Sequence, residues 1–329
     1  MPAVMQAGSP GSPVSIGPAH TGNVTGGSRQ WRPGELRRVL REQAGLDVVA
    51  VRAVSAGESR SAFWVTDHAG MVSVLKIMPG AGPEAADHLR ELDAVLARLR
   101  DRGYPAPRFG IIGQVPGLVF WVQPHLPGAV LDRGQQEPDC AAVARLLPAL
   151  LQLNDAQAGL GTGPRRWRSL ITRTLTSGGD GYCLHSTLQA SPDARDLLPV
   201  LRRVGERCGP AIPDGQDFVH FDFTPANLLS DGTAITGVID INPPVLAGDR
   251  AFDLATLLFY HYDHEQIRDL LRGRLLGLAG PQPACAYLAH MVLRQVDWSL
   301  RHHPAAAATR RHLRMARAIT ADISHSRAH

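Results

Sequence analysis

The chain has 329 residues, a mass of 35.4 kDa, 44% hydrophobic residues and a formal net charge of +4 at neutral pH. This length allows one large or two ordinary domains, and the small basic excess does not indicate nucleic-acid binding. No run of 18 apolar residues exists, so we expect no membrane-spanning segment and no membrane partner. The four cysteines lie too far apart for a disulfide framework or a zinc spacing. Widely spaced cysteines and the lack of a recognisable secretion signal favour a cytoplasmic location. The sequence indicates no obligate protein partner.

The N-terminal part begins with a segment that cannot fold alone. Residues 1–31 are rich in Gly, Ser, Pro and Ala without periodicity, and we expect a disordered leader. Residues 32–46 carry leucines at helical spacing and predict a short amphipathic helix. Beyond them, β-rich runs and one strongly periodic helix alternate. The predicted strands cover 47–57, 61–70, 71–78, 108–114 and 117–126, and the predicted helix covers 83–103. We therefore predict an N-terminal lobe over 32–125, with a small mixed or antiparallel sheet and one main helix.

The remaining residues, 126–329, have a mainly helical pattern and predict a second, larger lobe. One β-rich island, at 217–242, interrupts the helices. Asp231 and Gly232 stand between two apolar runs of this island, which is a strong hairpin signal. The region 251–278 has a continuous helical pattern that includes the polar stretch HYDHE at 261–265.

Lys76 is the only lysine among the 34 lysine and arginine residues. On a solvated surface the two cations are nearly interchangeable, but a site that needs a compact point charge on a flexible stem cannot use the planar arginine fork. Because Lys76 lies inside an apolar, β-branched run, we interpret it as a functional residue. The alternative is chance survival of a surface lysine.

A second group of candidate residues lies in the β-rich island, in the segment HFDFTPAN followed by VIDIN. Asp222 and Asn227 share one loop, and the predicted hairpin returns the chain so that Asp240 faces the same place. Two carboxylates and a carboxamide are oxygen ligands suited to Mg²⁺, with one carboxylate left to orient a hydroxyl. Phosphoryl transfer requires mainly positioning, metal and charge neutralisation, so this set fits that reaction. Lys76 then fits as the cation on the nucleotide phosphates, and Glu91 on the following helix as its partner.

The spacing H-x-D-x-x-x-x-N, then I-D, with a V-x-K strand before a Glu-bearing helix, resembles the protein-kinase-like fold. Within that fold the sequence is similar to the aminoglycoside phosphotransferase family, which includes choline-kinase-type relatives. The resemblance covers roughly residues 33–320 and is most specific in 217–260. It implies an α+β, two-lobed structure that binds ATP and Mg²⁺ between its lobes.

The resemblance also implies roles for individual residues. Asp222 would be the catalytic carboxylate, Asn227 and Asp240 would hold Mg²⁺, and Lys76 with Glu91 would position the phosphates. Supporting roles fall to His220, which ties the catalytic loop, and to Asp253, which holds backbone amides of that loop. The other nucleotide contacts are assigned to the hinge residues Gln123 and His125 and to the phosphate-loop residues Gly57, Ser59 and Ser61.

Two features depart from the family pattern. The family often has glycine where this chain has Phe221, and many relatives have an aromatic residue where Ile241 follows Asp240. Neither change removes a reacting group, so we interpret both as changes in loop packing or substrate shape.

The substrate-binding residues are less clearly marked. Asp263, Glu265 and Asp297 are candidates for contact with a cationic substrate. The alternative for the HYDHE stretch, which holds the first two, is a polar helix end or the rim of a pocket. His261 and His264 allow a metal site as a further alternative.

The expected function is transfer of the γ-phosphoryl group of MgATP to a hydroxyl of a small molecule. The resemblance favours an aminoglycoside or another hydroxyl-bearing antibiotic, with resistance as the consequence. Two alternatives stay open: a metabolic kinase for an amino alcohol, sugar or thioribose-like substrate, and a catalytically silent nucleotide-binding module.

Overall fold

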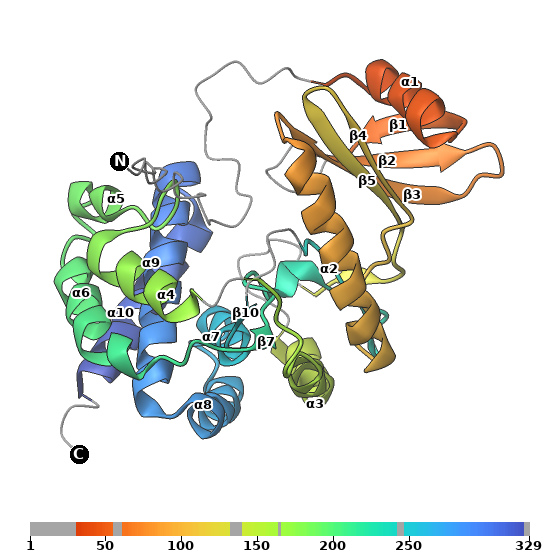
Figure 1. Cartoon of the computed structure of the whole chain (residues 1–329). Coiled ribbons are helices and arrows are strands. Elements are labelled where there is room, and N and C mark those ends of the chain that lie inside the picture. Colours follow the sequence, from red (N-terminus) through yellow and green to blue (C-terminus); the bar gives the residue numbers. More distant parts are fainter. Residues whose placement is uncertain (1–30, 55–60, 132–139, 164–165, 242–246, 326–329) are drawn as a thin grey trace, which may run out of the picture.

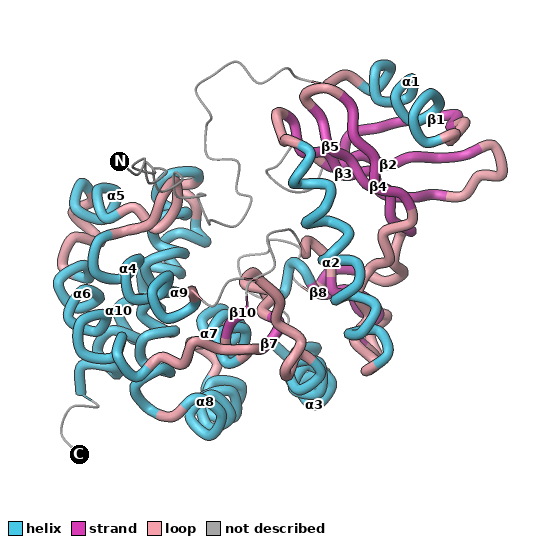
Figure 2. Tube along the Cα trace, viewed as in Figure 1, coloured by secondary structure: helices cyan, strands magenta, loops and turns pink. Residues whose placement is uncertain are grey.

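Two lobes of different composition make up the molecule (Figures 1 and 2). The structure is a computed structural model that describes residues 31–54, 61–131, 140–163, 166–241 and 247–325. The predicted leader therefore lies outside the described residues, apart from Trp31. Within the described ranges, no helix is both long and apolar enough to cross a membrane.

A five-stranded antiparallel sheet with the strand order β1-β2-β3-β5-β4 forms the N-terminal lobe, at the upper right of Figure 1. The predicted strands and helices of this lobe are all present. In chain order they are α1 (Pro33–Ala44), β1 (Val48–Ala53), β2 (Ala62–Asp67), β3 (Val72–Pro79), α2 (Pro83–Asp101), β4 (Ile111–Val115) and β5 (Leu118–Pro124).

The side-chain alternation of β3 decides which way Lys76 faces. Leu75 and Ile77 are buried in an apolar cluster that also holds Leu36 and Leu40 of α1. Because successive side chains of a strand point to opposite faces, Lys76 lies on the other face of the sheet. Its cross-strand neighbour there is Trp121 of β5, whose ring centre is 5.8 Å from the Lys76 ammonium.

Helix α2 packs on the face of the sheet opposite to α1. Its buried residues recur at helical spacing, as the sequence predicts, and belong to the large core that continues into the C-terminal lobe; they are Ala85, Ala86, Leu89, Leu92, Val95, Leu96 and Leu99. Trp121 belongs to the same core. The lobes are therefore joined by continuous apolar packing on the side of α2.

The C-terminal lobe is mainly helical, and α9 runs through its centre between α4, α6, α7 and α10 (Figure 1). Its helices are α3 (Cys140–Ala156), α4 (Trp167–Ser177), α5 (His185–Ala190), α6 (Leu197–Cys208), α7 (Ala251–Tyr260), α8 (Glu265–Ala279), α9 (Pro281–His302) and α10 (Ala307–His325). The residues of α9 are buried almost all round, which is typical of a central helix.

Five short strands of the C-terminal part, three of them in the β-rich island, form two small sheets beside the helices. They are β6 (Ala129–Val130), β7 (Asp217–Phe218), β8 (Leu228–Ser230), β9 (Ile235–Val238) and β10 (Ala247–Gly248), with β8 and β9 paired as an antiparallel hairpin. At its turn, Asp231 accepts hydrogen bonds from the backbone N–H groups of Thr233 and Ala234. The hairpin predicted at Asp231–Gly232 is thus confirmed.

One prediction for this lobe was wrong: the helical pattern of 251–278 is not one helix. Helix α7 ends at Tyr260 and α8 begins at Glu265. Asp263 in the turn between them forms an ion pair with Arg311 of α10, 2.6 Å away, so a tertiary contact fixes this break. Among the described residues, no three His, Cys, Asp or Glu side chains are grouped to hold a metal, which leaves the alternative of a site at His261 and His264 without support.

Three histidines of the C-terminal lobe are buried and neutral. Burial lowers the pKa of His290 to about 3, and that of His261 and His312 to about 4, from an ordinary 6.5. Neighbouring arginines lower each pKa further: Arg294 acts on His290, and Arg311 acts on the other two. In the unfolded chain all three would bind protons near pH 6.5.

We therefore expect the protein to lose stability in mild acid. The stability is fully present above pH 6.5 and falls as the pH decreases towards 4, because only the unfolded chain gains the protons in this window. Each histidine contributes about 2 kcal/mol of destabilisation at pH 5. Urea denaturation at pH 7.5, 6 and 5 measures this effect, and His290→Gln should flatten the pH dependence. A free energy of unfolding that stays constant between pH 7.5 and 5 would contradict it.

Candidate active site

A tight turn that follows β7 positions Asp222. In this turn Phe221 has a φ of 69°, a left-handed conformation that side chains other than glycine rarely adopt. The fully buried Asp253 of α7 holds the turn by accepting hydrogen bonds from the backbone N–H of His220 (2.8 Å) and of Phe221 (3.0 Å). Gln157 donates a third hydrogen bond to the same carboxylate, at 2.7 Å. These contacts offset the desolvation of Asp253, whose pKa burial nevertheless raises.

His220 ties this turn to the strand that leads to Asp240. One ring nitrogen, Nε2, lies 2.9 Å from the carbonyl oxygen of Ile239, and Nδ1 accepts the backbone N–H of Asp222 at 3.2 Å. Nε2 therefore carries the proton and donates to Ile239. Both ring nitrogens are used within the protein, so His220 has a structural role.

Asn227 lies at the end of the short 3₁₀ helix η2 (Pro225–Asn227), directly before β8. Its amide nitrogen donates to the carbonyl oxygen and to Oδ2 of Asp222, both at 2.9 Å. The carboxamide oxygen of Asn227 is thereby turned away from Asp222. The backbone oxygen of Asn227 accepts the N–H of Ile239 at 2.9 Å, so the hairpin brings Asp240 next to this loop.

These residues fit a divalent cation. The Asn227 carboxamide oxygen and the Asp240 carboxylate, whose side chain is 45% exposed, are oxygen ligands of the kind Mg²⁺ prefers. Asp240 has a φ of 62°, an unfavourable conformation for aspartate that the surrounding structure maintains. Strained residues of this kind often occur at functional sites.

Lys76 meets Asp240 across the two lobes. Its Nζ lies 2.6 Å from Oδ1 of Asp240, although the two residues are 164 positions apart, and only 14% of the lysine side chain is exposed. The expected partner, Glu91, is exposed on α2 and forms no ion pair with Lys76 in this structure. The Asp240 carboxylate takes the place expected for Glu91, because it reaches the largely buried ammonium directly.

Lys76→Arg is expected to weaken MgATP binding about tenfold or more, because the planar guanidinium is wider than the ammonium between Asp240 and the Trp121 ring. Calorimetric titration with MgATP measures this effect. Arg90→Lys provides the matched control, because Arg90 is 60% exposed and pairs only with Asp87 on its own helix. Unchanged nucleotide affinity and activity in Lys76→Arg would refute the role assigned to the lysine.

The structure adds a residue that the sequence analysis missed. Arg294 of α9 places Nη2 2.8 Å from Oδ1 of Asp222, and its side chain is only 7% exposed. Its position directly after the apolar run Met291–Leu293 of a predicted helix is the signal that could have identified it. The sequence analysis instead singled out Asp297, three residues later.

The hinge residues lie at the end of β5. Gln123 is buried, whereas His125 is exposed and contacts Trp64 of β2 edge to face, with ring centres 5.2 Å apart. Trp64 was not predicted, yet it stands on the same face of the sheet as Lys76. Of the predicted phosphate-loop residues, Gly57 and Ser59 lie outside the described residues. The backbone oxygen of Ser61 accepts the N–H of Ile77 at 2.8 Å, which fixes the start of β2.

The predicted substrate residues are not grouped at this site. Asp297 is fully buried and paired with Arg301, with nitrogen–oxygen distances of 3.0 and 2.9 Å, so it is not accessible to a substrate. Asp263 is paired with Arg311 as described above, and Glu265 is exposed at the start of α8. Asp253 near the start of α7 contacts the turn at His220 and Phe221, whereas Asp263 lies beyond the opposite end of the same helix, which ends at Tyr260. These positions give the substrate prediction no support.

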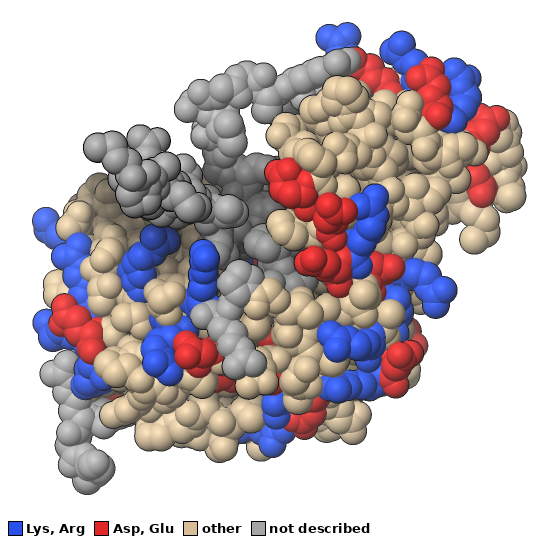
Figure 3. Space-filling model, in the orientation of Figure 1, with Lys and Arg blue, Asp and Glu red and all other residues tan. Residues whose placement is uncertain are grey.

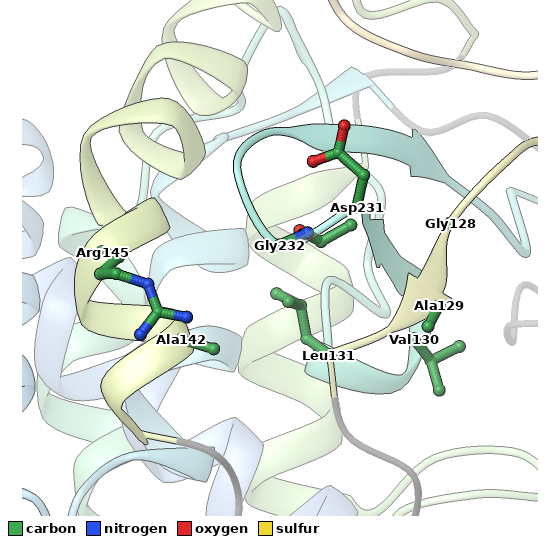
Figure 4. A pocket seen from close by; sticks show the side chains of 9 residues that line it. Gly128, Ala129, Val130, Leu131, Ala142, Arg145, Asp231 and Gly232 are labelled. Atoms are coloured by element: carbon green, nitrogen blue, oxygen red, sulfur yellow. The ribbon is translucent and has the colours of Figure 1, made fainter.

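A separate pocket of about 470 Å³ lies between the β8–β9 turn and α3. Figure 4 shows Arg145 and Ala142 of α3 on one side of it, and Asp231, Gly232 and Gly128–Leu131 on the other. None of the residues discussed above as catalytic or metal-binding lines this pocket, so it is distinct from the candidate active site.

Comparison with known proteins agrees with this geometry. The model of the phosphotransferase enzyme family matches residues 50–287, which is more than half of the chain. The chain belongs to this family. Its members transfer phosphate to hydroxyl acceptors, and this phosphotransferase is accordingly an enzyme. No curated protein matches the sequence.

Solved structures share the fold of this phosphotransferase at low sequence identity. A thermostable mutant of the aminoglycoside phosphotransferase APH(4)-Ia is 23% identical, covers 87% of this chain and 98% of its own, and has a TM-score of 0.62. The same enzyme in a ternary complex with ADP and hygromycin B is 22% identical, with coverage of 89% and 99% and a TM-score of 0.62. Macrolide 2'-phosphotransferase MphH from Brachybacterium faecium is 19% identical, covers 85% and 97%, and has a TM-score of 0.54.

Proposed function

We propose that this phosphotransferase transfers the γ-phosphoryl group of MgATP to a hydroxyl of a cationic small molecule, with an aminoglycoside-type antibiotic as the favoured acceptor. The observation that carries the proposal is the meeting of Asp222 with Asn227, and of Lys76 with Asp240, at one place between the lobes. These four side chains supply a proton acceptor, two oxygen ligands and a phosphate-binding cation, which is what phosphoryl transfer requires.

Each residue has a defined task in the reaction. The acceptor hydroxyl donates its hydrogen bond to Asp222, its oxygen forms the new bond to the γ-phosphorus, and the bond from that phosphorus to the β-phosphate oxygen breaks to release ADP. Asp222 takes the hydroxyl proton and later returns it to solvent. Asn227 and Asp240 would hold Mg²⁺, which when bound neutralises charge on the β- and γ-phosphate oxygens.

Lys76 has to exchange partners during nucleotide binding. In the structure its ammonium neutralises Asp240 at 2.6 Å. With nucleotide bound, the ammonium moves to the α- and β-phosphate oxygens and leaves Asp240 to the metal. The adenine is assigned to the hinge, where Gln123, His125 and Trp64 come together at the end of β5.

The distribution of charge favours a cationic acceptor. Figure 3 shows acidic atoms gathered over α2, beside the other lobe. The exposed acidic residues near the start and middle of this helix are Glu84, Asp87 and Glu91, three positions that fall close to one face. Arg90 pairs with Asp87 on this face, so the three carboxylates leave an acidic excess rather than a uniformly acidic surface. Such an excess raises the local concentration of oppositely charged substrates. The hygromycin B bound by the related enzyme is consistent with an amine-bearing acceptor.

Phosphorylation assays over a panel of acceptors test this proposal. The panel contains aminoglycosides, macrolides, amino alcohols and fructosamines, since a fructosamine kinase of the same fold, at 14% identity and a TM-score of 0.52, supports a metabolic alternative. ADP release that one cationic antibiotic stimulates at least about tenfold is the expected result. Stimulation by a fructosamine or amino alcohol alone would replace the antibiotic with a metabolite. No release with any acceptor, together with no MgATP-induced rise in melting temperature, would refute the proposal.

A further inference from the structure

Arg294 of the central helix α9 contacts the turn at His220–Asp222, which we call the catalytic turn. Its neighbours in the helix, from His290 to Leu293, are all buried, and its own side chain is only 7% exposed. A buried guanidinium is costly unless its donors and its charge are matched. The groups that contact the Arg294 guanidinium therefore indicate its role.

Those partners are two consecutive residues of the catalytic turn. Nη2 donates to Oδ1 of Asp222 at 2.8 Å, and Nη1 donates to the backbone carbonyl oxygen of Phe221. The guanidinium carbon also lies 4.9 Å from the centre of the Phe221 ring, within the range of a cation–π contact. One arginine thus contacts the side chain, the backbone and the ring of this turn.

The contact with Phe221 bears on the backbone of the turn. Phe221 has the left-handed φ of 69°, and its N–H is held by Asp253 of α7. Arg294 holds the carbonyl at the other end of the same residue. The strained turn is therefore fixed from two helices, with an acceptor on its N–H side and a donor on its C=O side.

The contact with Asp222 bears on the reacting carboxylate. Arg294 donates to Oδ1, and Asn227 donates to Oδ2 at 2.9 Å. With both oxygens bonded, the carboxylate plane is fixed, while 28% of the side chain is still exposed for an acceptor hydroxyl.

We propose that Arg294 is a positioning residue for the reaction: it fixes the orientation of the Asp222 carboxylate and does not touch the substrate. This inference rests on the proposed role of Asp222 as proton acceptor. It predicts that Arg294 matters for turnover only as long as residue 222 is a carboxylate.

A double-mutant cycle of Arg294→Met and Asp222→Asn tests the inference. In the wild-type background, Arg294→Met should lower kcat about 10- to 100-fold and leave KM for MgATP within about twofold. In the Asp222→Asn background, the same change should alter the residual rate by less than about twofold. A merely structural arginine would lower the rate by the same factor in both backgrounds, and that result, or no effect in either, would overturn the inference.

Arg301→Met provides the matched control. Arg301 lies seven residues later on α9 and also pairs with a carboxylate, that of Asp297, through two bonds of 3.0 and 2.9 Å. Its removal costs an ion pair of the same kind, yet should leave kcat within about twofold. A loss of kcat as large as that of Arg294→Met would overturn the inference, because it would show that the loss of any ion pair on α9 lowers kcat to this extent.

Two further measurements cover the remaining outcomes. If Arg294→Met does not fold, Arg294→Lys replaces it in the cycle; the retained charge should reduce the loss of kcat to about three- to tenfold. If the wild type transfers no phosphate, the proposed function fails. The free energies of unfolding of the same four proteins are then measured by urea denaturation. Coupling of about tenfold in the folding equilibrium between residues 222 and 294 would support the positioning contact, and additive effects would overturn it.

Discussion

Asp222→Asn is expected to reduce kcat about 100- to 10,000-fold, the contribution of a positioned general base, while the affinity for MgATP changes little. The carboxamide keeps the size of the carboxylate but cannot take the hydroxyl proton. It also presents an amide N–H₂ to Arg294 or Asn227, both of which donate to Asp222 in the wild type. Steady-state ADP release gives the loss of turnover, and calorimetric titration gives the affinity.

Asp231→Asn is the matched control for this prediction. Asp231 undergoes the same chemical change, but it lies in the exposed turn at the opposite end of the β8–β9 hairpin, where it accepts only local hydrogen bonds. It should retain turnover within about twofold. If Asp222→Asn turned over as fast as Asp231→Asn, the carboxylate would not be the proton acceptor.

The second large effect concerns stability and activity together. Asp253→Ala is expected to lower the free energy of unfolding by about 3 to 5 kcal/mol, because it leaves two backbone N–H groups and the Gln157 amide buried without an acceptor. Release of the strained Phe221 turn should also lower kcat. Urea denaturation gives the stability, and ADP release at a temperature where the variant is folded gives the activity.

Thr256→Val, one turn further along α7, serves for comparison. Thr256 is also fully buried, but its hydroxyl bonds only to the carbonyl of Phe252 and to Met291, and valine has the same shape. Loss of the Thr256 hydroxyl should lower the free energy of unfolding by about 1 kcal/mol. A cost for Asp253→Ala no greater than this would show that the carboxylate does not hold the catalytic turn.

Local patterns in the sequence predicted most of the fold. The alternation around Lys76, the Asp231–Gly232 turn and the helical spacing of α2 are properties of neighbouring residues, so short-range physics determines them. His220, Asp222 and Asn227 are likewise close in sequence, and the hairpin brings Asp240 to them. This is why the core of the candidate site could be predicted.

Contacts between distant segments could not be predicted in the same way. Asp222 and Arg294 are 72 positions apart, and which face of α9 meets the catalytic turn depends on the packing of the whole lobe. The partner of Lys76 depended on the placement of α2, which leaves Glu91 exposed. Arg301 stands four residues after Asp297, at the spacing of an ion pair on one helix, so this pairing was open to prediction. The burial of Asp297 was not, because it depends on the packing of the whole lobe.

The central claim is that Asp222, Asn227, Asp240 and Lys76 together transfer the γ-phosphoryl group to a hydroxyl. Phosphorus-31 NMR of the protein with MgATP and the most stimulating acceptor tests this most directly, with Asp222→Asn alongside. The account predicts that a phosphomonoester signal of the acceptor appears in step with ADP, and that it is lost in the variant. Formation of ADP and inorganic phosphate alone, at the same rate with and without Asp222, would contradict it.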